Sequence, residues 1–415
     1  MSSARFLFLT QTYPRFDGDT SGPFIRDLAR NLVAAGDRVT VLTPHAPDVQ
    51  AEWLDDGVEV KSFRYAPESY ELMGYSRSLE KDETMKVGAM AVTPLYLLGA
   101  YRAVARELRG GRDRGGAYDL IQAHWVVPNG MVAHHFSRRV PVAVGLHGSD
   151  VFLAEKPGVR QWARWSLKGV SVLTGCSPEL VSRVNAVGFP EEKSRVIPYG
   201  VNGELFSPNL ERRSIWRDKL GIPEHAPMAV SVGRMATKKG YHVLMEQIDR
   251  LMAEHPKLHL VLAGAGDRLE ELKGKAAAHA GRVHFPGAVY RDTLPDLYRA
   301  ADAFILPAVH DPKGNVDGLP NVILEAMATA LPVVATEISG IPLAVEDGVN
   351  GRLIPEQDAG AAVDALLDVL SDLDRARAWG RAGRQKTSSQ LSWQAVAAKY
   401  RSAYDLALPG AKRRG

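Results

Sequence analysis

The chain alternates two apolar patterns along most of its length. Short apolar runs bounded by turn residues are typical of buried strands, and longer segments with helical spacing separate them. In the first half we predict strands at 5–10, 38–43, 120–123, 140–146 and 172–175, with a helix at 23–35. In the second half we predict strands at 230–233, 258–263, 283–285, 303–306 and 332–335. This alternation predicts parallel sheets with helices on both faces.

Chain length predicts two such α/β domains. At 415 residues the chain exceeds the size at which one hydrophobic core stops growing. Turn residues cluster at 196–208, after the first series of strands, so the boundary is expected there. Ser392 is the predicted N-cap of a final amphipathic helix at 393–406, and a basic tail follows at 412–415. The predicted division, in chain order, is 1–203, 204–390 and 391–415.

Composition excludes several classes of protein. A net charge of +3 is too small to indicate a nucleic-acid partner. Cys176 is the only cysteine, which excludes an intramolecular disulfide or a thiolate metal cluster and fits a reducing compartment. The longest apolar stretch, 87–101, is interrupted by Pro94 and is shorter than the roughly 20 residues that span a bilayer. We therefore expect a cytoplasmic protein.

The segment 317–328 carries the most informative pattern. Asp317 and Glu325 lie eight positions apart, on the two sides of a Gly/Pro turn that opens a helix. The amides of 321–323 begin that helix, and the positive end of a helix can receive an anion. Such a turn could hold a polyol and a phosphate together. Taken alone, an acidic loop followed by a core helix explains the pattern as well.

A second turn carries two cations. Gly233 ends a predicted buried strand, and Arg234 and Lys239 follow it, five positions apart, before a helix. Both cations can converge on one diphosphate beyond the strand end, although solvated loop cations are the alternative. Gly264 and Gly266 lack the third glycine of a dinucleotide fingerprint, and we interpret them as close packing of a helix on a strand.

Together, the two turns resemble the donor-binding motifs of the retaining GT-B glycosyltransferases of family 4. The resemblance covers nearly the whole chain. It implies an α/β fold of two Rossmann-like, doubly wound domains facing a cleft. The first domain would bind the acceptor and the second the nucleotide sugar, and the terminal helix would cross back to the first. It implies a nucleoside diphosphate sugar, a UDP- or GDP-sugar first of all, as donor and no cofactor.

The resemblance also implies roles for individual residues. Arg234 and Lys239 would bind the donor diphosphate and stabilise its charge as it departs, which makes both catalytic. Glu325 would accept the ribose hydroxyls, and Asp317 would bind the donor sugar as a catalytic residue. The family more often has Glu at the position of Asp317, so the sugar can sit differently here. The other expected donor contacts are Gly22, Val289 at the base, Gly318, Leu319, Asn321 and Val322.

Two histidines end predicted strands of the first half. The resemblance implies that His147 is catalytic and positions a sugar hydroxyl near the reacting carbon, and that His124 shapes the acceptor pocket. A structural role is the alternative. Ser21 and Gly22 stand where the family has a glycine-rich turn. We expect Ser21 at the acceptor and Gly22 at a phosphate, with helix initiation at Pro23 as the other interpretation.

No metal is expected, because Arg234, Lys239 and the helix end after Pro320 could stabilise the departing diphosphate without one. The pair His134-His135 has no carboxylate nearby at the spacing of metal ligands, so we interpret it as a non-metal pair. Basic residues with aromatic neighbours form two further clusters. The clusters are Arg102, Arg106, Arg109, Arg112 and Arg114, and then Arg160, Arg164 and Lys168 beside Trp162 and Trp165. A solvated helix face is the simpler interpretation, and an anionic lipid surface is the other. On the second interpretation the enzyme is peripheral at the inner face of the membrane.

The sequence therefore predicts a retaining, metal-independent glycosyltransferase that moves a hexosyl unit from a nucleoside diphosphate sugar to an acceptor hydroxyl. The acceptor would be a sugar, a glycolipid or a lipid-linked sugar, in glycolipid, polysaccharide or glycoconjugate biosynthesis. A nucleotide-sugar epimerase, which needs no acceptor, and a glycosyl phosphorylase, which responds to inorganic phosphate, could share the architecture. A non-catalytic sugar-nucleotide-binding protein is a third alternative.

Overall fold

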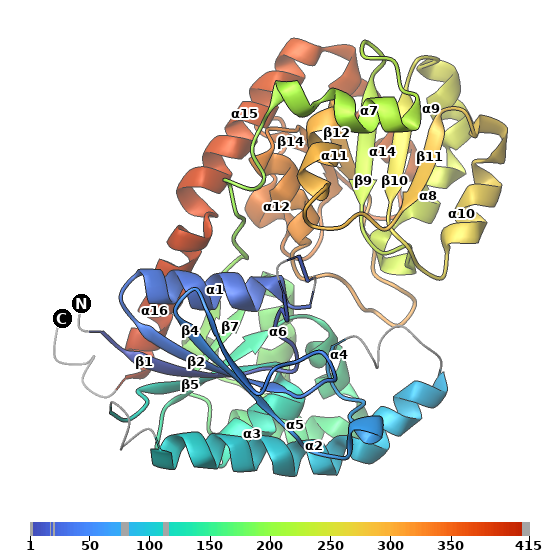
Figure 1. Ribbon diagram of the computed structural model, residues 1–415. Helices are drawn as coiled ribbons and strands as arrows, with labels where there is room; N and C mark the ends of the chain where they lie inside the picture. Colours follow the sequence, from blue (N-terminus) through green and yellow to red (C-terminus); the bar gives the residue numbers. More distant parts are fainter. Residues whose placement is uncertain (1–2, 17, 20, 76–82, 111–115, 409–415) are drawn as a thin grey trace. The chain divides into compact units, whose positions relative to one another are not determined.

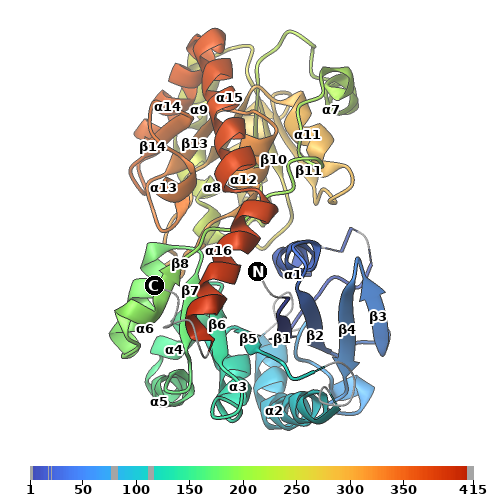
Figure 2. The same cartoon turned by 90° about the vertical axis from the view of Figure 1, so that its left-hand side faces the viewer.

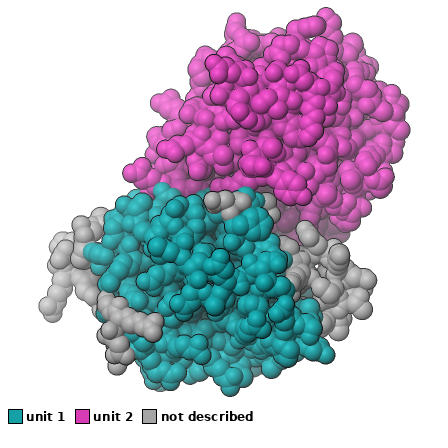
Figure 3. Space-filling model, in the orientation of Figure 1, with its two compact units in different colours: residues 1–197, 396–415 teal, residues 198–395 magenta. Residues whose placement is uncertain are grey.

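The computed structural model describes residues 3–16, 18–19, 21–75, 83–110 and 116–408. It divides the chain into two compact units (Figure 3). Unit 1 comprises 1–197 and 396–415, and unit 2 comprises 198–395. The chain passes from unit 1 to unit 2 after Ile197, within the turn-rich segment 196–208. This boundary lies six residues before the predicted one at 203. The predicted basic tail at 412–415 and the clustered Arg112 and Arg114 lie outside the described residues.

Within the described residues, unit 1 holds an eight-stranded sheet in the order β3-β4-β2-β1-β5-β6-β7-β8. Neighbouring strands pair in parallel, except for the antiparallel pair of β3 and β4. The central strands β1, β5, β6 and β7 are buried along their whole length, which explains why most of their residues are apolar. The bounds are β1 (Arg5–Leu9), β2 (Arg38–Pro44), β3 (Glu52–Asp55), β4 (Val58–Phe63), β5 (Leu120–His124), β6 (Val142–Leu146), β7 (Val172–Gly175) and β8 (Ser194–Val196).

Helices cover both faces of this sheet. Helices α1 (Pro23–Ala34) and α16 (Trp393–Ala407) lie on one face, whereas α2 (Glu83–Gly110), α3 (Met131–His134) and α5 (Pro157–Leu167) lie on the other (Figures 1 and 2). The remaining helices are α4 (Ser149–Glu155) and α6 (Pro178–Val187). Helix α2 continues through Pro94, which the sequence pattern treats as an interruption.

Helix α16 begins after Ser392, as predicted, and Ser392 Oγ accepts a hydrogen bond from the Ala395 amide at 3.2 Å. From Val396 onward the helix belongs to unit 1. There the Tyr404 ring packs 5.1 Å from the ring of Phe6, and Arg401 pairs with Asp37 at 3.1 Å. The last helix is therefore part of the core of the first unit.

Unit 2, all of whose residues are described, holds a six-stranded parallel sheet in the order β11-β10-β9-β12-β13-β14. Its strands are β9 (Met228–Val232), β10 (His259–Ala263), β11 (Val283–Gly287), β12 (Ala303–Leu306), β13 (Val333–Thr336) and β14 (Gly351–Ile354). Its helices are α7 (Ser214–Leu220), α8 (Tyr241–Glu246), α9 (Ile248–Glu254), α10 (Leu269–Lys275), α11 (Leu294–Ala300), α12 (Asn321–Ala328), α13 (Ile341–Ala344), α14 (Ala359–Ser371) and α15 (Leu373–Gln390). Both units are doubly wound α/β domains, which confirms the predicted fold class.

The strands that the sequence analysis missed are β3, β4, β8 and β14. All four contain exposed or half-buried polar positions, so their sequences lack a continuous apolar run. Three of them, β3, β8 and β14, are edge strands. None of the helices in the described part of the chain is long and apolar enough to cross a membrane.

Candidate functional site

The polar residues singled out in unit 2 gather where β9 and β12 end. These strands are neighbours in the sheet, so the turn 233–240 after β9 lies beside the loop 307–320 after β12. The Val309 amide donates to the Lys238 carbonyl at 3.0 Å, and this bond joins the two segments. Gly240 has φ 69°, and a Cβ there would lie 1.5 Å from the Pro307 carbonyl oxygen. Only glycine permits this close approach.

Gly264 and Gly266 support the same turn from the other side. A Cβ on Gly264 would lie 1.9 Å from the Gly233 carbonyl oxygen, and one on Gly266 would lie 2.5 Å from that of Met235. The Met235 amide donates to the Ala265 carbonyl at 2.9 Å. These glycines therefore pack loop against loop, which corrects the interpretation of a helix packed on a strand.

Asp317 is held by two lysines of the neighbouring turn. Lys238 Nζ lies 2.6 Å from Asp317 Oδ1, and Lys239 Nζ lies 2.7 Å from Oδ2. Burial raises the pKa of Asp317, but the attraction of Lys239 and Lys238 outweighs burial and holds the pKa below its usual value. Asp317 is therefore ionised at neutral pH. Sequence reasoning missed Lys238, although it stands beside the predicted Lys239.

Arg234 differs from the two lysines. It is exposed, and no ion pair joins it to a carboxylate in the part of the chain that the structure describes. Its cationic head is therefore available to an anion at the end of β9. Lys239 instead packs its aliphatic stem against Gly233, where an added Cβ would lie 3.2 Å from Lys239 Cε.

The turn that follows Asp317 opens helix α12. The Gly318 carbonyl accepts from the Gly340 amide at 2.7 Å, and the Leu319 side chain is buried. Only the backbone of Leu319 can therefore face a ligand. Asn321 begins α12, and its Oδ1 is buried without a hydrogen-bond partner among the described residues. A buried carbonyl oxygen of this kind normally accepts a hydrogen bond, so a donor group of a bound ligand would satisfy it. Val322 is half-buried beside it.

Glu325 lies one turn further along α12. Its Oε2 accepts a hydrogen bond from the hydroxyl of Tyr298 at 2.9 Å. Tyr298 lies on α11 and is fully buried, and burial followed by the Glu325 charge raises its pKa well above the usual value. Tyr298 thus fixes the orientation of the Glu325 carboxylate. It lies 27 residues away in sequence, so no local pattern identified it.

Val289 lies in the loop that follows β11 and is half-buried. The Gly287 carbonyl at the end of β11 accepts from the Gly264 amide at 2.8 Å, so this loop joins the one behind the cationic turn. Within unit 2, all of which the structure describes, neither a hydrogen bond nor an ion pair joins Val289 to Asp317 or the lysines. We call Arg234, Lys238, Lys239, Asp317, the turn 318–322 and Glu325 the charged site.

The two histidines of unit 1 do meet. They end or follow neighbouring strands, β5 and β6, and His124 Nδ1 lies 2.9 Å from His147 Nε2. Burial lowers the pKa of His147 to about 3, and burial with the nearby His147 lowers the pKa of His124 well below its usual value. Both rings are therefore neutral at pH 7. In the neutral pair one ring donates the shared hydrogen bond and the other accepts it.

Asp150, which the sequence analysis did not single out, holds the turn around these rings. Its carboxylate accepts from the amides of Val126 at 3.1 Å, His147 at 3.2 Å and Gly148 at 3.1 Å. Trp125 lies 5.0 Å from the His147 ring, with φ 72°. One buried carboxylate therefore ties the end of β5 to the end of β6.

The Ser21-Gly22 turn reaches the same place. The Phe24 ring of α1 lies 4.7 Å from the His147 ring. Gly22 has φ 71° and caps α1, with Pro23 as the first helical residue. A Cβ on Gly22 would lie 2.9 Å from Thr12 Cγ2, so helix initiation and packing account for this glycine. The Ser21 amide donates to Asp19 at 3.0 Å. We call Ser21, Gly22, Phe24, His124, Trp125, His147 and Asp150 the histidine site.

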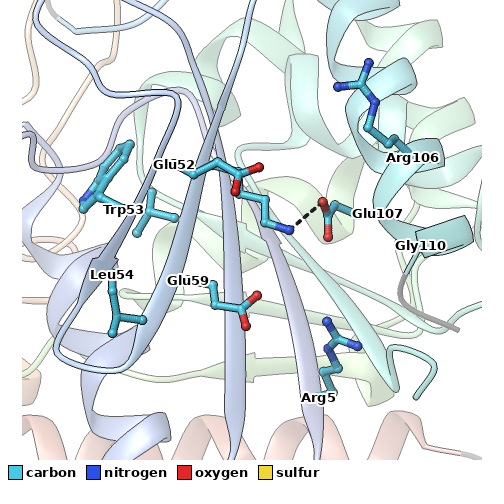
Figure 4. A pocket seen from close by; sticks show the side chains of 10 residues that line it. Arg5, Glu52, Trp53, Leu54, Glu59, Arg106, Glu107 and Gly110 are labelled. Atoms are coloured by element: carbon cyan, nitrogen blue, oxygen red, sulfur yellow. Dashed lines mark hydrogen bonds and ion pairs between the residues drawn. The ribbon is translucent and has the colours of Figure 1, made fainter. Parts of the chain in front are cut away.

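A pocket in unit 1 lies elsewhere (Figure 4). It is lined by residues near the beginnings of β1 and β4, by β3 and by the last turns of α2, among them Arg5, Glu59 and Glu107. Glu107 already pairs with Lys61 at 2.8 Å. Ligands of open α/β sheets bind at the carboxyl ends of the strands. This pocket lies near the amino ends of β1 and β4, so we do not include it in the candidate site.

Comparison with known proteins decides the family. Residues 212–386 match the family model described as "Glycosyl transferases group 1", and residues 20–200 match the "Glycosyl transferase 4-like domain". Over 261 residues the chain is 31% identical to a GDP-mannose-dependent alpha-(1-6)-phosphatidylinositol monomannoside mannosyltransferase of Mycobacterium tuberculosis, covering 62% of this chain and 68% of the relative. The chain belongs to the group 1, or GT4, glycosyltransferases.

Further relatives agree with this assignment. The glycosyltransferase is 26% identical to a glycogen synthase of M. tuberculosis over 99% of its own length and 96% of the relative. It superposes on sucrose-phosphate synthase from Thermosynechococcus elongatus with a TM-score of 0.75 at 21% identity, covering 97% and 98% of the two chains, which supports the GT-B fold. The predicted class of enzyme, a hexosyltransferase dependent on a nucleotide sugar, is confirmed.

Proposed function

We propose that this glycosyltransferase is retaining and metal-independent, and that it transfers a hexosyl unit to an acceptor hydroxyl. The observation that carries the proposal is the Asp317 carboxylate held between Lys238 and Lys239 at the turn that opens α12. A nucleoside diphosphate sugar needs cations for its diphosphate and a carboxylate for sugar hydroxyls, and this site supplies both.

In this proposal Lys239, Arg234 and the amides of Asn321 and Val322 stabilise the charge that develops on the departing diphosphate. Each such donor typically contributes on the order of 100-fold to 1000-fold in rate. Asp317 binds a donor-sugar hydroxyl, together with the backbone of 318–319. Fixed side-chain cations and helix amides supply the positive charge, so no divalent ion is required.

The proposal assigns the nucleoside to Glu325 and Val289. Glu325, which Tyr298 orients, accepts the ribose hydroxyls, and Val289 lies against the base. We propose a GDP- or UDP-sugar and would test GDP-mannose first, because the mycobacterial relatives at 30% and 31% identity are named for it.

The histidine site is proposed to serve the acceptor side. His147 positions a sugar hydroxyl as a neutral group, Ser21 and His124 line the acceptor, and the Gly22 amide contacts a phosphate. The low pKa of both histidines argues against either of them taking a proton at neutral pH. The leaving phosphate would instead take the acceptor proton on the face of the bond that breaks, which retains the anomeric configuration. We propose that the reaction is cytoplasmic.

The test begins with thermal stabilisation by nucleoside diphosphates and their sugars, with and without a divalent-metal chelator. We expect one diphosphate to raise the melting temperature in the presence of the chelator. The responding sugar is then incubated with candidate acceptors, and NMR of the product reports the anomeric configuration. We expect Lys239→Gln to lose stabilisation by the nucleotide, and Lys257→Gln, an exposed lysine elsewhere in unit 2, to keep it.

Other outcomes would contradict the proposal. Conversion of the nucleotide sugar without any acceptor would indicate an epimerase, and dependence on inorganic phosphate would indicate a phosphorylase. Nucleotide binding without turnover across the acceptor panel would favour a non-catalytic protein. Loss of stabilisation on chelation would refute metal independence.

A further inference from the structure

Helices α2, α3 and α5 form one continuous surface of unit 1. They lie on the same side of the sheet in both views, and Figure 2 shows them in a row in the order α5, α3, α2 (Figures 1 and 2). Tyr101 of α2 stacks on Phe136, which directly follows α3, with ring centroids 5.0 Å apart. The ring centroid of Trp165 of α5 lies 4.1 Å from that of His134 of α3 and 5.1 Å from that of His135. These aromatic contacts join the three helices side by side in one layer of unit 1.

This face is cationic. Its exposed cations are Arg102, Arg106, Arg109, Arg138, Arg139, Lys156, Arg160, Arg164 and Lys168. The sequence has one acid, Glu107, in the ranges 91–110, 131–140 and 156–168, and it pairs with Lys61 at 2.8 Å. None of the nine cations forms an ion pair with a carboxylate in the described part of the chain. We call these nine residues, with Leu95, Leu98, Tyr101 and Trp162, the basic face.

The basic face departs from an ordinary solvated helix surface. Such a surface mixes both signs of charge, and pairs of opposite sign three or four residues apart support the helix. Here Arg102, Arg106 and Arg109 continue the three-to-four-residue spacing of Leu95 and Leu98 along α2, without an acid between them on that stripe. Like charges at this spacing repel, so the isolated protein gains no helix stability from them.

Large apolar side chains are exposed within the same face. Trp162 is 58% exposed, Leu95 46% and Leu98 45%. A soluble polyanion would be satisfied by the cations alone and would leave these side chains in water. The interfacial region of a bilayer accepts aromatic and aliphatic groups beside anionic headgroups.

We propose that the basic face binds the surface of an anionic lipid bilayer. The proposal rests on the proposed transfer of a hexosyl unit to an acceptor hydroxyl, and it adds that this acceptor is lipid-linked. Helix α2 connects the parallel strands β4 and β5, so it runs antiparallel to them and its apolar first half lies toward their carboxyl ends. The histidine site occupies that same edge of the sheet. A membrane on the basic face would thus present lipid-linked acceptors beside the histidine site.

The test uses the full chain and vesicles. Wild-type protein is sedimented with vesicles of phosphatidylcholine alone and with an equimolar mixture of phosphatidylglycerol and phosphatidylcholine, at low and high salt. We expect binding to the mixed vesicles only, and weaker binding at high salt because salt screens the headgroup charge. Arg102→Gln/Arg160→Gln/Lys168→Gln should lower the partition coefficient on the order of 100-fold.

A matched control removes the same charge elsewhere. Lys193→Gln/Lys257→Gln/Arg381→Gln changes three exposed cations outside the basic face and should bind the mixed vesicles like wild type. Leu98→Ser/Trp162→Ser should weaken the binding that remains at high salt. Equal vesicle binding by the two triple variants, or no binding by the wild type, would overturn the proposal. So would a wild-type dimer that the first triple variant converts to a monomer, because the face would then join two copies of the chain.

Vesicle binding needs no nucleotide, whereas the thermal assay needs no lipid. If a nucleotide still stabilises the Arg102→Gln/Arg160→Gln/Lys168→Gln variant, the charged site of that variant is intact. Failure of the membrane proposal and failure of the proposed function are therefore distinguishable.

Discussion

The charged site of unit 2 holds Asp317 between two lysines, whereas the histidine site of unit 1 holds two rings that burial keeps neutral. Both sites lie at the carboxyl ends of parallel strands, and both depend on glycine turns. They differ in the interactions that stabilise their buried polar groups. Unit 2 uses opposite charges, and unit 1 uses hydrogen bonds from backbone amides to Asp150 and contacts between aromatic rings.

On the proposed function, the difference corresponds to the two halves of a glycosyl transfer. A departing diphosphate gains negative charge, and fixed cations stabilise it most when they are already in place. An acceptor hydroxyl is neutral, and a neutral imidazole can bond to it without attracting a competing anion. Variants that remove charge should therefore act mainly through unit 2, whereas the histidine pair of unit 1 should lower the stability of the fold as the pH falls below about 6.5.

The largest expected effect is that of Lys239. Lys239→Gln should lower kcat/KM for the donor by about 100-fold to 1000-fold, because it removes a cation from the leaving diphosphate. Lys238→Gln should cost only about tenfold, because Lys239 still holds Asp317 in place. Steady-state kinetics with the nucleotide sugar separates the two, with Lys257→Gln as control. Equal losses for Lys238→Gln and Lys239→Gln would show that both lysines have the same role.

The second effect distinguishes the sites by pH. A histidine whose folded pKa lies below its unfolded value stabilises the fold above the unfolded pKa, and this stability is lost as the pH falls below it. For His124 and His147 the loss begins near pH 6.5 and amounts to at most about 1.4 kcal/mol per pH unit for each ring. The lowered pKa of Asp317 has its effect only below about pH 4.

Urea denaturation at a series of pH values between about 6.5 and 4.5 measures this loss. Other histidines with lowered pKa values, among them His259 and His284, contribute to the wild-type slope. The double variant His124→Gln/His147→Gln should therefore show a shallower slope, not a flat one. An unchanged slope would mean that the pair does not stay neutral in the folded protein.

Sequence predicted the parts of the molecule that local pattern determines. The buried strands of both sheets and the two turns of the charged site are contiguous segments, and each was identified from its own residues. The pairing of β9 with β12, which brings Lys238 and Lys239 to Asp317, depends on strand order. The edge strands β3, β8 and β14 were missed because half-exposed strands lack a continuous apolar run.

Residues that act on a site through packing were also missed. Tyr298 lies on a helix whose apolar residues look like any other core residues, and only the packing of the folded chain brings its hydroxyl to Glu325. Asp150 is closer in sequence to His147, but its bond to the Val126 amide depends on the pairing of β5 with β6.

The smallest expected effect tests whether Tyr298 matters for function or only for stability. Tyr298→Phe removes the hydroxyl that orients Glu325 and should cost about 1 kcal/mol in unfolding free energy. If Glu325 binds the ribose, donor KM should also rise, by up to about tenfold, while kcat changes little. Tyr118→Phe is the matched control, because Tyr118 also bonds a carboxylate, Glu107, at 3.1 Å, away from both sites. A KM that is equal in the two variants, with similar losses of stability, would restrict Tyr298 to a structural role. It would also indicate that Glu325 does not bind the donor. If the Glu325 carboxylate contacted the ribose, loss of the hydroxyl that orients this carboxylate would weaken the contact and raise the donor KM.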